Sequence, residues 1–408
     1  MRWLVTLGII AFAAPVSPAA EPEPLRRGLA VHEWGVFRVN PDGDFANAEV
    51  RAEWDSLPAF IYGFIKGRVV PHHWGAIETR FRPLVFFHAS QPQMVRVKVD
   101  FPGGMPGVWY PATEQPSIEG NFKQPRIGTS LEWSIGIKKL PVTWVPRTPT
   151  PPEVADTHWF AKARKIKCDE IFAKYGPREN DVEREKFIFY DGLFPANKWL
   201  KIAVDGNKVA LTSQVAHPVY DVTVVDRRRD KPKIARIDKV DAKATVAKVE
   251  WIDGDASTFV TDASRKLTEQ LVAAGLNEDE ANLLVDSWKT DMFERPGLHV
   301  FYRIPQSEYD VRMPLTVTPK PDSTVRVGLI FHGHLEPDFA ERILKLVKEL
   351  DSKRFGDRDA ATKKLLEIGP AALVQIQRLR DRKDLSVEVR ERIDVLIKKW
   401  NAKAAFDY

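Results

Sequence analysis

Alternating apolar and polar residues predict β-strands over most of the chain. Valines alternate with charged residues across Met94–Phe101, and large apolar residues alternate with polar ones across Ser130–Leu140. A period of two with one apolar face is typical of a half-buried antiparallel strand. Asp205-Gly206 separates two such runs, which predicts a hairpin because tight turns of this kind need positive φ. The same pattern predicts further strands at residues 84–88, 186–190, 220–225, 298–304, 315–318 and 325–332.

Two segments within this strand-rich region have helical spacing instead. One helix is predicted over about Trp54–Ile65. A helix pair is predicted over residues 267–293, with Asn277 as the N-cap of its second helix. Both are expected to be insertions that decorate the β framework.

Apolar residues recur at helical spacing from residue 336 onwards. Ile343 and Leu346 share one helix face, and Ile393 and Leu396 share another. The segment resembles a HEAT-like helical repeat pair, and this resemblance implies an interaction or docking element. Because stacked repeats normally bury their faces against neighbours, we expect so small a unit to pack on the β body.

These patterns predict an α+β protein, in which a mainly antiparallel, sandwich-like β body carries helical insertions and a C-terminal α-helical segment. The β-rich domain is expected over residues 21–335 and the helical segment over 336–408. Residues 1–20 have the layout of a signal peptide, with Arg2 before an apolar run that is too short to span a bilayer. We therefore expect an exported protein, periplasmic or extracellular, with no transmembrane anchor after signal removal.

The charge of the chain limits the class of partner. The 408 residues carry a formal net charge of only +5, with acidic residues interleaved among the basic ones. The densest basic cluster, Asp226–Lys231, is predicted to be a solvated loop, and no nucleic-acid partner is expected.

Cys168 is the single cysteine, which excludes an internal disulfide framework. The fold must therefore be held together by its core.

Six segments are distinctive when they are read together. They are HEWGVF at 32–37, RPLVFFH at 82–88, VKVDFPGGMPGVWYPA at 97–112, HWFAKAR at 158–164, EKFIFYDG at 185–192 and the long run at 271–305. In this order they resemble a widespread group of uncharacterised secreted bacterial proteins that begin with an His-Glu-Trp-Gly motif. The similarity covers roughly residues 30 to 335, and it implies no reaction because the group has no established activity. The group tends to carry Gly-Arg where this chain has Gly333-His334, so a role for His334 would belong to this chain alone.

The His-Glu-Trp-Gly motif itself is the first candidate site. In an extended strand His32 and Trp34 share one face, while Glu33 points to the other. His32 and Glu33 are then a poor acid/base pair, and we favour a structural role in which Trp34 packs where Gly35 lets another backbone approach. The alternative has His32 or Glu33 lining a pocket at the sheet edge, where His32 and Trp34 are binding candidates and Glu33 is the candidate catalytic base of a metal-assisted hydrolase.

The second candidate is an His-x-His pair, His332 and His334, at the end of a predicted strand. Alternation places both imidazoles on one face, where they could bind a transition metal such as zinc. A third ligand would come from elsewhere, such as His32, Glu33, or His72 in the near echo PHHWGA. The structural alternative is two polar residues on a solvent-exposed face.

The third candidate is aromatic. Twelve tryptophans are present, and Trp109-Tyr110 with other aromatic residues could stack on sugar rings if they were exposed. The alternative is that these rings belong to the core. Arg164, in the HWFAKAR segment, is a further binding candidate.

No compact catalytic signature stands out in the sequence. There is no Gly-x-Ser-x-Gly elbow and no His-Glu-x-x-His helix. We therefore expect a non-enzymatic exported protein that binds an envelope or extracellular protein or glycan, with the C-terminal helices supplying or bracing the contact surface. Two alternatives stay open: a metal-assisted hydrolase that uses His332 and His334, and a carbohydrate-binding module.

Overall fold

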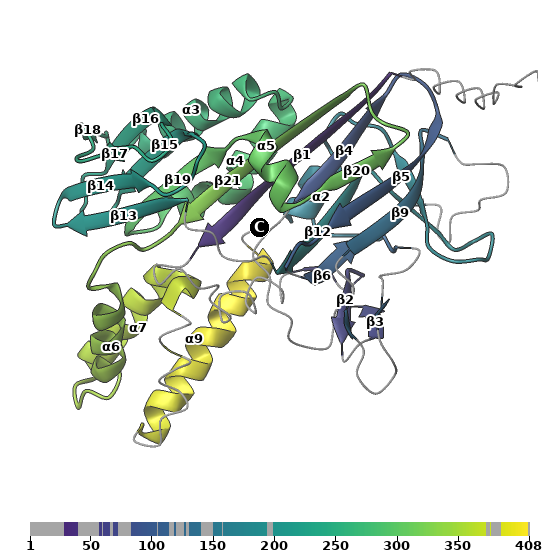
Figure 1. Cartoon of the computed structure of the whole chain (residues 1–408). Coiled ribbons are helices and arrows are strands. Elements are labelled where there is room, and N and C mark those ends of the chain that lie inside the picture. Colours follow the sequence, from purple (N-terminus) through teal and green to yellow (C-terminus); the bar gives the residue numbers. More distant parts are fainter. Residues whose placement is uncertain are drawn as a thin grey trace, which may run out of the picture.

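The computed structural model places a large mixed sheet at the centre of the protein, with helices on one side and smaller sheets on the other (Figure 1). The α+β class is therefore confirmed, and the sheets are mainly antiparallel, as expected. The structure describes residues 28–39, 57–58, 60–65, 68–71, 83–103, 105–113, 118–119, 126–127, 130–139, 150–156, 158–193, 199–372, 376 and 385–406.

The main sheet has eleven strands. In spatial order they are β18 (Ile252–Asp253), β16 (Lys233–Val240), β15 (Val219–Asp226), β19 (Leu298–Ile304), β21 (Ser323–His332), β1 (Leu29–Val39), β4 (Leu84–Ala89), β12 (Phe187–Leu193), β6 (Met105–Tyr110), β2 (Tyr62–Ile65) and β3 (Arg68–Pro71). Strands β1 and β21 are parallel, and the other neighbouring strands of this sheet, within the described residues, pair antiparallel. The N-terminal and C-terminal strands of the β body thus meet at the middle of the sheet.

A second, antiparallel sheet packs on one face of the main sheet. Its strands in order are β11 (Val182–Glu185), β10 (Ile171–Lys174), β9 (Ser130–Ile137), β5 (Gln93–Asp100) and β20 (Leu315–Thr318). Alternate residues of β5 and β9, such as Val97 and Trp133, are fully buried in one core with Val31 and Phe87 of the main sheet. Two smaller sheets comprise β13 (Leu200–Asp205), β14 (Lys208–Ser213) and β17 (Thr245–Val246), and β7 (Ile118–Glu119) with β8 (Arg126–Ile127).

Helices cover the opposite face of the main sheet. They are α2 (Trp159–Ala163), α3 (Phe259–Ala273), α4 (Glu278–Lys289) and a π-helical turn at Thr290–Glu294. Helix α4 begins with a capping box in which Asn277 and Glu280 exchange side-chain and backbone hydrogen bonds, so the predicted N-cap is confirmed. Helix α5 (Gln306–Arg312) contributes Tyr309 to the core between the sheets.

Strand β1 is consequently buried on both faces. Its register pairs His32 with Phe86 of β4 and Glu33 with Arg326 of β21. Trp34 lies in the core under the helices, whereas Val31 lies in the core between the sheets. The predicted alternation of side chains in this strand is observed. A half-buried strand would expose one face to solvent, but in β1 the second sheet covers one face and the helices cover the other.

The predicted helix over Trp54–Ile65 is wrong where the structure describes it. Residues 62–65 form β2, which pairs with β6 and β3. Pairing with neighbouring strands therefore determines the conformation of these residues, although their apolar residues have helical spacing.

The hairpin at Asp205-Gly206 is confirmed, and Gly206 has φ +57°.

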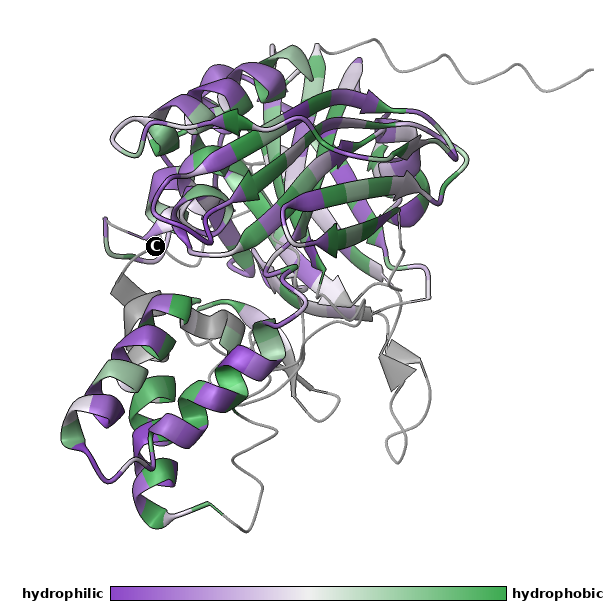
Figure 2. Cartoon of the chain, turned by 90° about the vertical axis from the view of Figure 1, so that its left-hand side faces the viewer, coloured by the Kyte–Doolittle hydropathy of each residue, from purple (hydrophilic) through white to green (hydrophobic). Residues whose placement is uncertain are grey.

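The C-terminal segment forms helices α6 (Phe339–Glu349), α7 (Phe355–Ile368), a short 3₁₀ turn at Gly369–Ala372 and α9 (Val387–Phe406). Ile343, Leu365 and Ile393 are fully buried in a core of their own. Figure 2 shows these helices as a group beside the β body, with polar residues on their outer faces. They contact the body where the His334 ring stacks on Phe339, with centroids 4.4 Å apart.

None of the helices in the described part of the chain combines the length and the apolar character that a membrane-spanning helix requires. The predicted signal peptide at 1–20 and the candidate ligand His72 lie outside the described residues.

Candidate functional site

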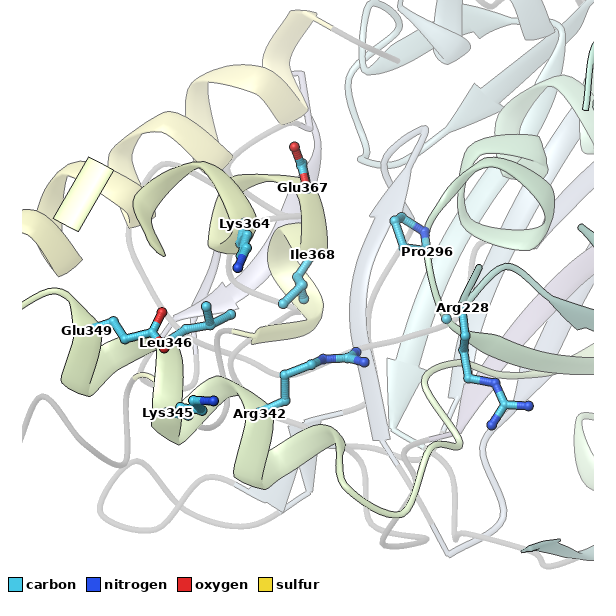
Figure 3. Close-up of a pocket in the computed structure, with 10 residues that line it drawn as sticks. Arg228, Pro296, Arg342, Lys345, Leu346, Glu349, Lys364, Glu367 and Ile368 are labelled. Atoms are coloured by element: carbon cyan, nitrogen blue, oxygen red, sulfur yellow. The ribbon is translucent and has the colours of Figure 1, made fainter. Parts of the chain in front are cut away.

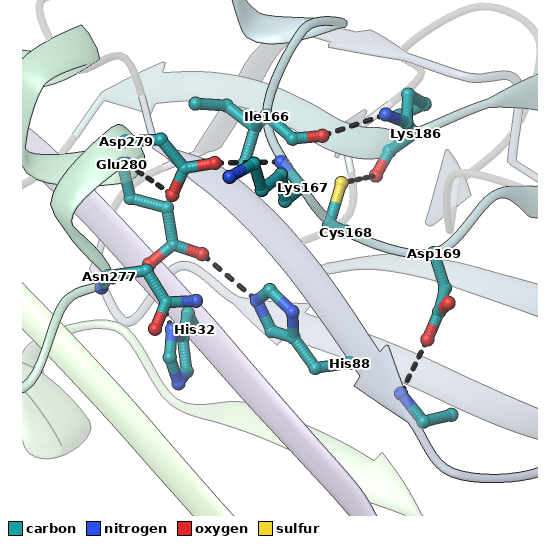
Figure 4. Close-up of polar contacts among 11 residues, drawn as sticks. His32, His88, Ile166, Lys167, Cys168, Asp169, Lys186, Asn277, Asp279 and Glu280 are labelled. Carbon is teal, nitrogen blue, oxygen red and sulfur yellow. Dashed lines mark hydrogen bonds and ion pairs between the residues drawn. The ribbon is translucent and has the colours of Figure 1, made fainter.

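The histidine of the His-Glu-Trp-Gly motif, His32, belongs to a polar cluster between the main sheet and α4. The Nδ1 atom of His32 lies 2.8 Å from Oε2 of Glu280, and Nε2 of His88 lies 3.0 Å from Oε1 of the same carboxylate (Figure 4). The two imidazole centroids are 4.8 Å apart because His32 and His88 are diagonal neighbours on β1 and β4. Each imidazole thus faces one oxygen of a single carboxylate.

Helix α4 fixes the Glu280 carboxylate in this position. The carboxylate accepts a third hydrogen bond, through Oε2 from the backbone N–H of Asn277 at 3.0 Å, as the capping box requires. Glu280 is fully buried. Burial raises the pKa of its carboxyl, but hydrogen bonds from His32 and His88 outweigh that effect and lower the pKa to about 2. The carboxylate is therefore ionised at neutral pH.

Glu33 belongs to a different cluster, on the sandwich side of β1. Its Oε2 accepts a hydrogen bond from Nε of Arg326 at 2.5 Å, and its Oε1 accepts from the hydroxyls of Tyr309 and Tyr190. Both side chains of the Glu33–Arg326 ion pair are at most 1% exposed. Burial and the nearby Glu33 charge hold the pKa of the Tyr309 hydroxyl well above its usual range. Glu33 is an internal counter-ion here, with its oxygens already engaged.

His332 and His334 do not share a face, so the predicted pair of neighbouring ligands is wrong. Strand β21 ends at His332, and His334 has φ +54°, which takes it out of the strand alternation. Nε2 of His332 lies 3.2 Å from the Tyr302 hydroxyl, within hydrogen-bond distance, while His334 packs against His299 and Phe339. Both imidazoles are buried, so the solvent-exposed alternative is also wrong.

The aromatic candidates are core residues. Trp109 is fully buried and Tyr110 is 1% exposed, because β6 lies inside the main sheet with both faces covered. Trp133, Trp159 and Trp199 are buried as well. An exposed sugar platform is therefore not formed by these residues.

Arg164 is likewise committed to internal contacts. Its guanidinium donates to both oxygens of the buried Glu185 carboxylate, from Nη2 to Oε2 at 2.7 Å and from Nε to Oε1 at 3.1 Å, and to the carbonyl of Pro152. It also lies over the Phe160 ring, 5.1 Å from the centroid. Arg164 thus links the end of α2 to β11 of the second sheet, and its guanidinium N–H groups are engaged inside the protein.

A pocket of about 330 Å³ lies where the C-terminal helices meet the β body (Figure 3). The body contributes Arg228, Pro296 and Gly297, and the helices contribute Arg342, Lys345, Leu346, Glu349, Lys364, Glu367 and Ile368. Arg228 pairs with Asp226 at 2.7 Å, and Arg342 pairs with Glu336 at 3.2 Å. Within the described residues, no ion pair engages Lys345 or Lys364. The pocket therefore combines an apolar floor with charges of both signs.

Comparisons with known proteins add no family. No protein-family model matches the sequence, and no curated protein matches it.

Sequence reasoning missed His88 and Glu280. His88 ends the RPLVFFH segment, where alternation places it on the same face as Leu84 and Phe86, and Glu280 belongs to the capping box of a predicted helix. Each residue had a local signal, but their proximity is a tertiary contact across 192 positions. The spacing of residues along the sequence does not reveal that His88 and Glu280 are close in space.

Replacing Arg326 with Met tests the structural role of Glu33. The variant leaves a buried carboxylate without its cation, and we expect it to lose about 3 to 5 kcal/mol of the free energy of unfolding, measured by urea denaturation. Arg96→Met is the matched control, because Arg96 pairs with Glu132 at 3.2 Å in an exposed position. That control should lose no more than about 1 kcal/mol. Equal losses in the two variants would contradict the assignment.

The buried His332 predicts a pH-dependent loss of stability. Burial lowers the pKa of its imidazole from 6.5 to about 4. The unfolded chain takes up this proton below pH 6.5 and the folded chain only near pH 4, so stability is lost as the pH falls through this window. In His332→Phe the fall in unfolding free energy between pH 7 and pH 4 should be smaller by about 3 kcal/mol. An unchanged fall, measured by denaturation at each pH, would show that His332 is not the group responsible.

Proposed function

We propose that the chain is an exported, non-enzymatic protein that binds a segment of a cell-envelope or extracellular protein at the junction of its C-terminal helices and β body. Membership of the secreted His-Glu-Trp-Gly group and export by residues 1–20 belong to the same proposal. The observation that supports it is the junction pocket, which neither unit forms alone.

The lining of the pocket favours a protein partner over a glycan or a polyanion. Leu346, Ile368 and Pro296 offer apolar surface for a side chain to dock against. Lys345 and Lys364 stand beside Glu349 and Glu367, so the two signs of charge are mixed around it. A peptide with an apolar anchor flanked by charged residues satisfies both features, because complementary charges fix the register of such a contact.

Two contacts join the C-terminal helices to the β body. The His334 ring stacks on Phe339 at the start of α6, and Nη1 of Arg295 donates to the carbonyl of Ile368 at the end of α7, at 3.5 Å. Gly369, with φ +76°, lies so close to Arg295 that a Cβ there would meet the guanidinium. Both units are thus in direct contact where they form the pocket.

The two remaining readings have less support. The metal-assisted hydrolase needs His332 and His334 as neighbouring ligands, and the described structure separates their imidazoles. The carbohydrate-binding module needs exposed rings, and the candidate aromatic residues are buried.

Site-specific photo-crosslinking tests the proposal. A photo-crosslinking amino acid at Lys345, inside the pocket, should give a discrete protein adduct when the chain is incubated with envelope extract and irradiated. The same amino acid at Lys348 is the matched control, because Lys348 is exposed on the same helix but does not line the pocket. That control should give no adduct.

Exchanging two charges distinguishes pocket recognition from incidental contact. The double variant Lys364→Glu/Glu367→Lys keeps the net charge and reverses the local pattern, so the adduct yield from position 345 should fall roughly tenfold. Equal adducts at positions 345 and 348, or an adduct insensitive to the exchange, would contradict the proposal.

A further inference from the structure

We infer that His32, His88 and Glu280 form a binding site for one divalent transition-metal ion, which joins the N-terminus of α4 to strands β1 and β4. The inference is independent of the partner-binding pocket, which lies at the junction with the C-terminal helices.

The ligand atoms already converge. One nitrogen from each imidazole and an oxygen of the carboxylate lie within 4.8 Å of one another. A tetrahedral ion with bonds of 2.0 to 2.2 Å separates its ligand atoms by about 3.3 to 3.6 Å. The imidazole nitrogens lie 2.8 and 3.0 Å from the two oxygens of Glu280, so these hydrogen bonds would open by roughly half an ångström to admit an ion. An ion between them would replace the protons that the imidazoles now share with Glu280. Two histidines and one glutamate are an established ligand set for Zn²⁺.

The electrostatics of the buried carboxylates single out this cluster. Glu33, Glu185 and Glu280 are all fully buried. Glu33 is paired with Arg326 and Glu185 with Arg164, so each has a permanent cation. Among the described contacts of Glu280, the charged partners are two imidazoles, which are cations only when protonated. A buried carboxylate needs a compensating charge, and a dication bound between the carboxylate and the two imidazole nitrogens supplies one.

The supporting structure holds the three ligands rigidly and leaves one of them accessible. His32 and His88 stand on adjacent strands of the main sheet, and the capping hydrogen bond from Asn277 fixes Glu280. Sites built on strands and helices hold ligand geometry better than sites on loops. The His88 side chain is 23% exposed, against 11% for His32, so an ion would enter from the His88 side.

Zinc uptake by the full chain tests the inference. The untagged protein, prepared without chelator and equilibrated with Zn²⁺, should hold one zinc per chain by elemental mass spectrometry after gel filtration. His88→Gln should weaken zinc binding at least a hundredfold in competition with a chromophoric chelator, since it removes a ligand. His217→Gln is the matched control, because His217 also pairs with a carboxylate, Glu308 at 3.2 Å, outside the cluster. It should bind zinc as the parent does.

Two further readouts keep the test decisive. Co²⁺ bound to the parent should give the visible absorption bands of a four-coordinate site, and this readout needs no variant. His32→Gln gives a second ligand deletion if His88→Gln fails to fold by circular dichroism. A parent that takes up neither Zn²⁺ nor Co²⁺, or a folded ligand variant that binds zinc like the parent, would show that the cluster is only an imidazole–carboxylate clamp and would overturn the inference.

Discussion

Strand β1 has hydrogen-bonded neighbours on both edges and packed layers on both faces, so each polar side chain that it carries must find its partner inside the protein. His32 meets Glu280 in the helical layer, and Glu33 meets Arg326 in the layer between the sheets. The two residues are adjacent in sequence but serve opposite faces of the sheet. The motif therefore ties three layers together through one strand.

Each face of β1 carries a contact to a buried carboxylate, and the two carboxylates have different partners. On the sandwich side, Arg326 stands directly across from Glu33 on the parallel strand β21, and the tyrosine hydroxyls complete the hydrogen bonding. On the helical side the carboxylate belongs to α4, and its partners are the imidazoles of His32 and His88. The cation of the first cluster is a guanidinium, whereas the second cluster presents two imidazole nitrogens, which are common metal ligands. This difference supports the proposed ligand role of the second cluster and a structural role for the first.

The sequence predicts local features of this arrangement well. Period two in the His-Glu-Trp-Gly segment correctly separates His32 and Trp34 from Glu33, and the N-cap at Asn277 follows from residue type and spacing. It fails where a tertiary contact decides. Residues 62–65 have helical spacing but pair as an inner strand, and His334 leaves its strand through a positive φ. The burial of Trp109 on β6 depends on which strands become central, and that is set by pairings between distant segments.

Strand β1 is the structural centre of the β body, with covered faces and paired edges, and amide hydrogen exchange tests this most directly. Amides that open only when the whole domain unfolds exchange with the free energy of global unfolding. We expect this behaviour for the hydrogen-bonded amides of Val31 to Val36. Exchange of these amides through local opening, at a free energy several kcal/mol below global unfolding, would contradict it.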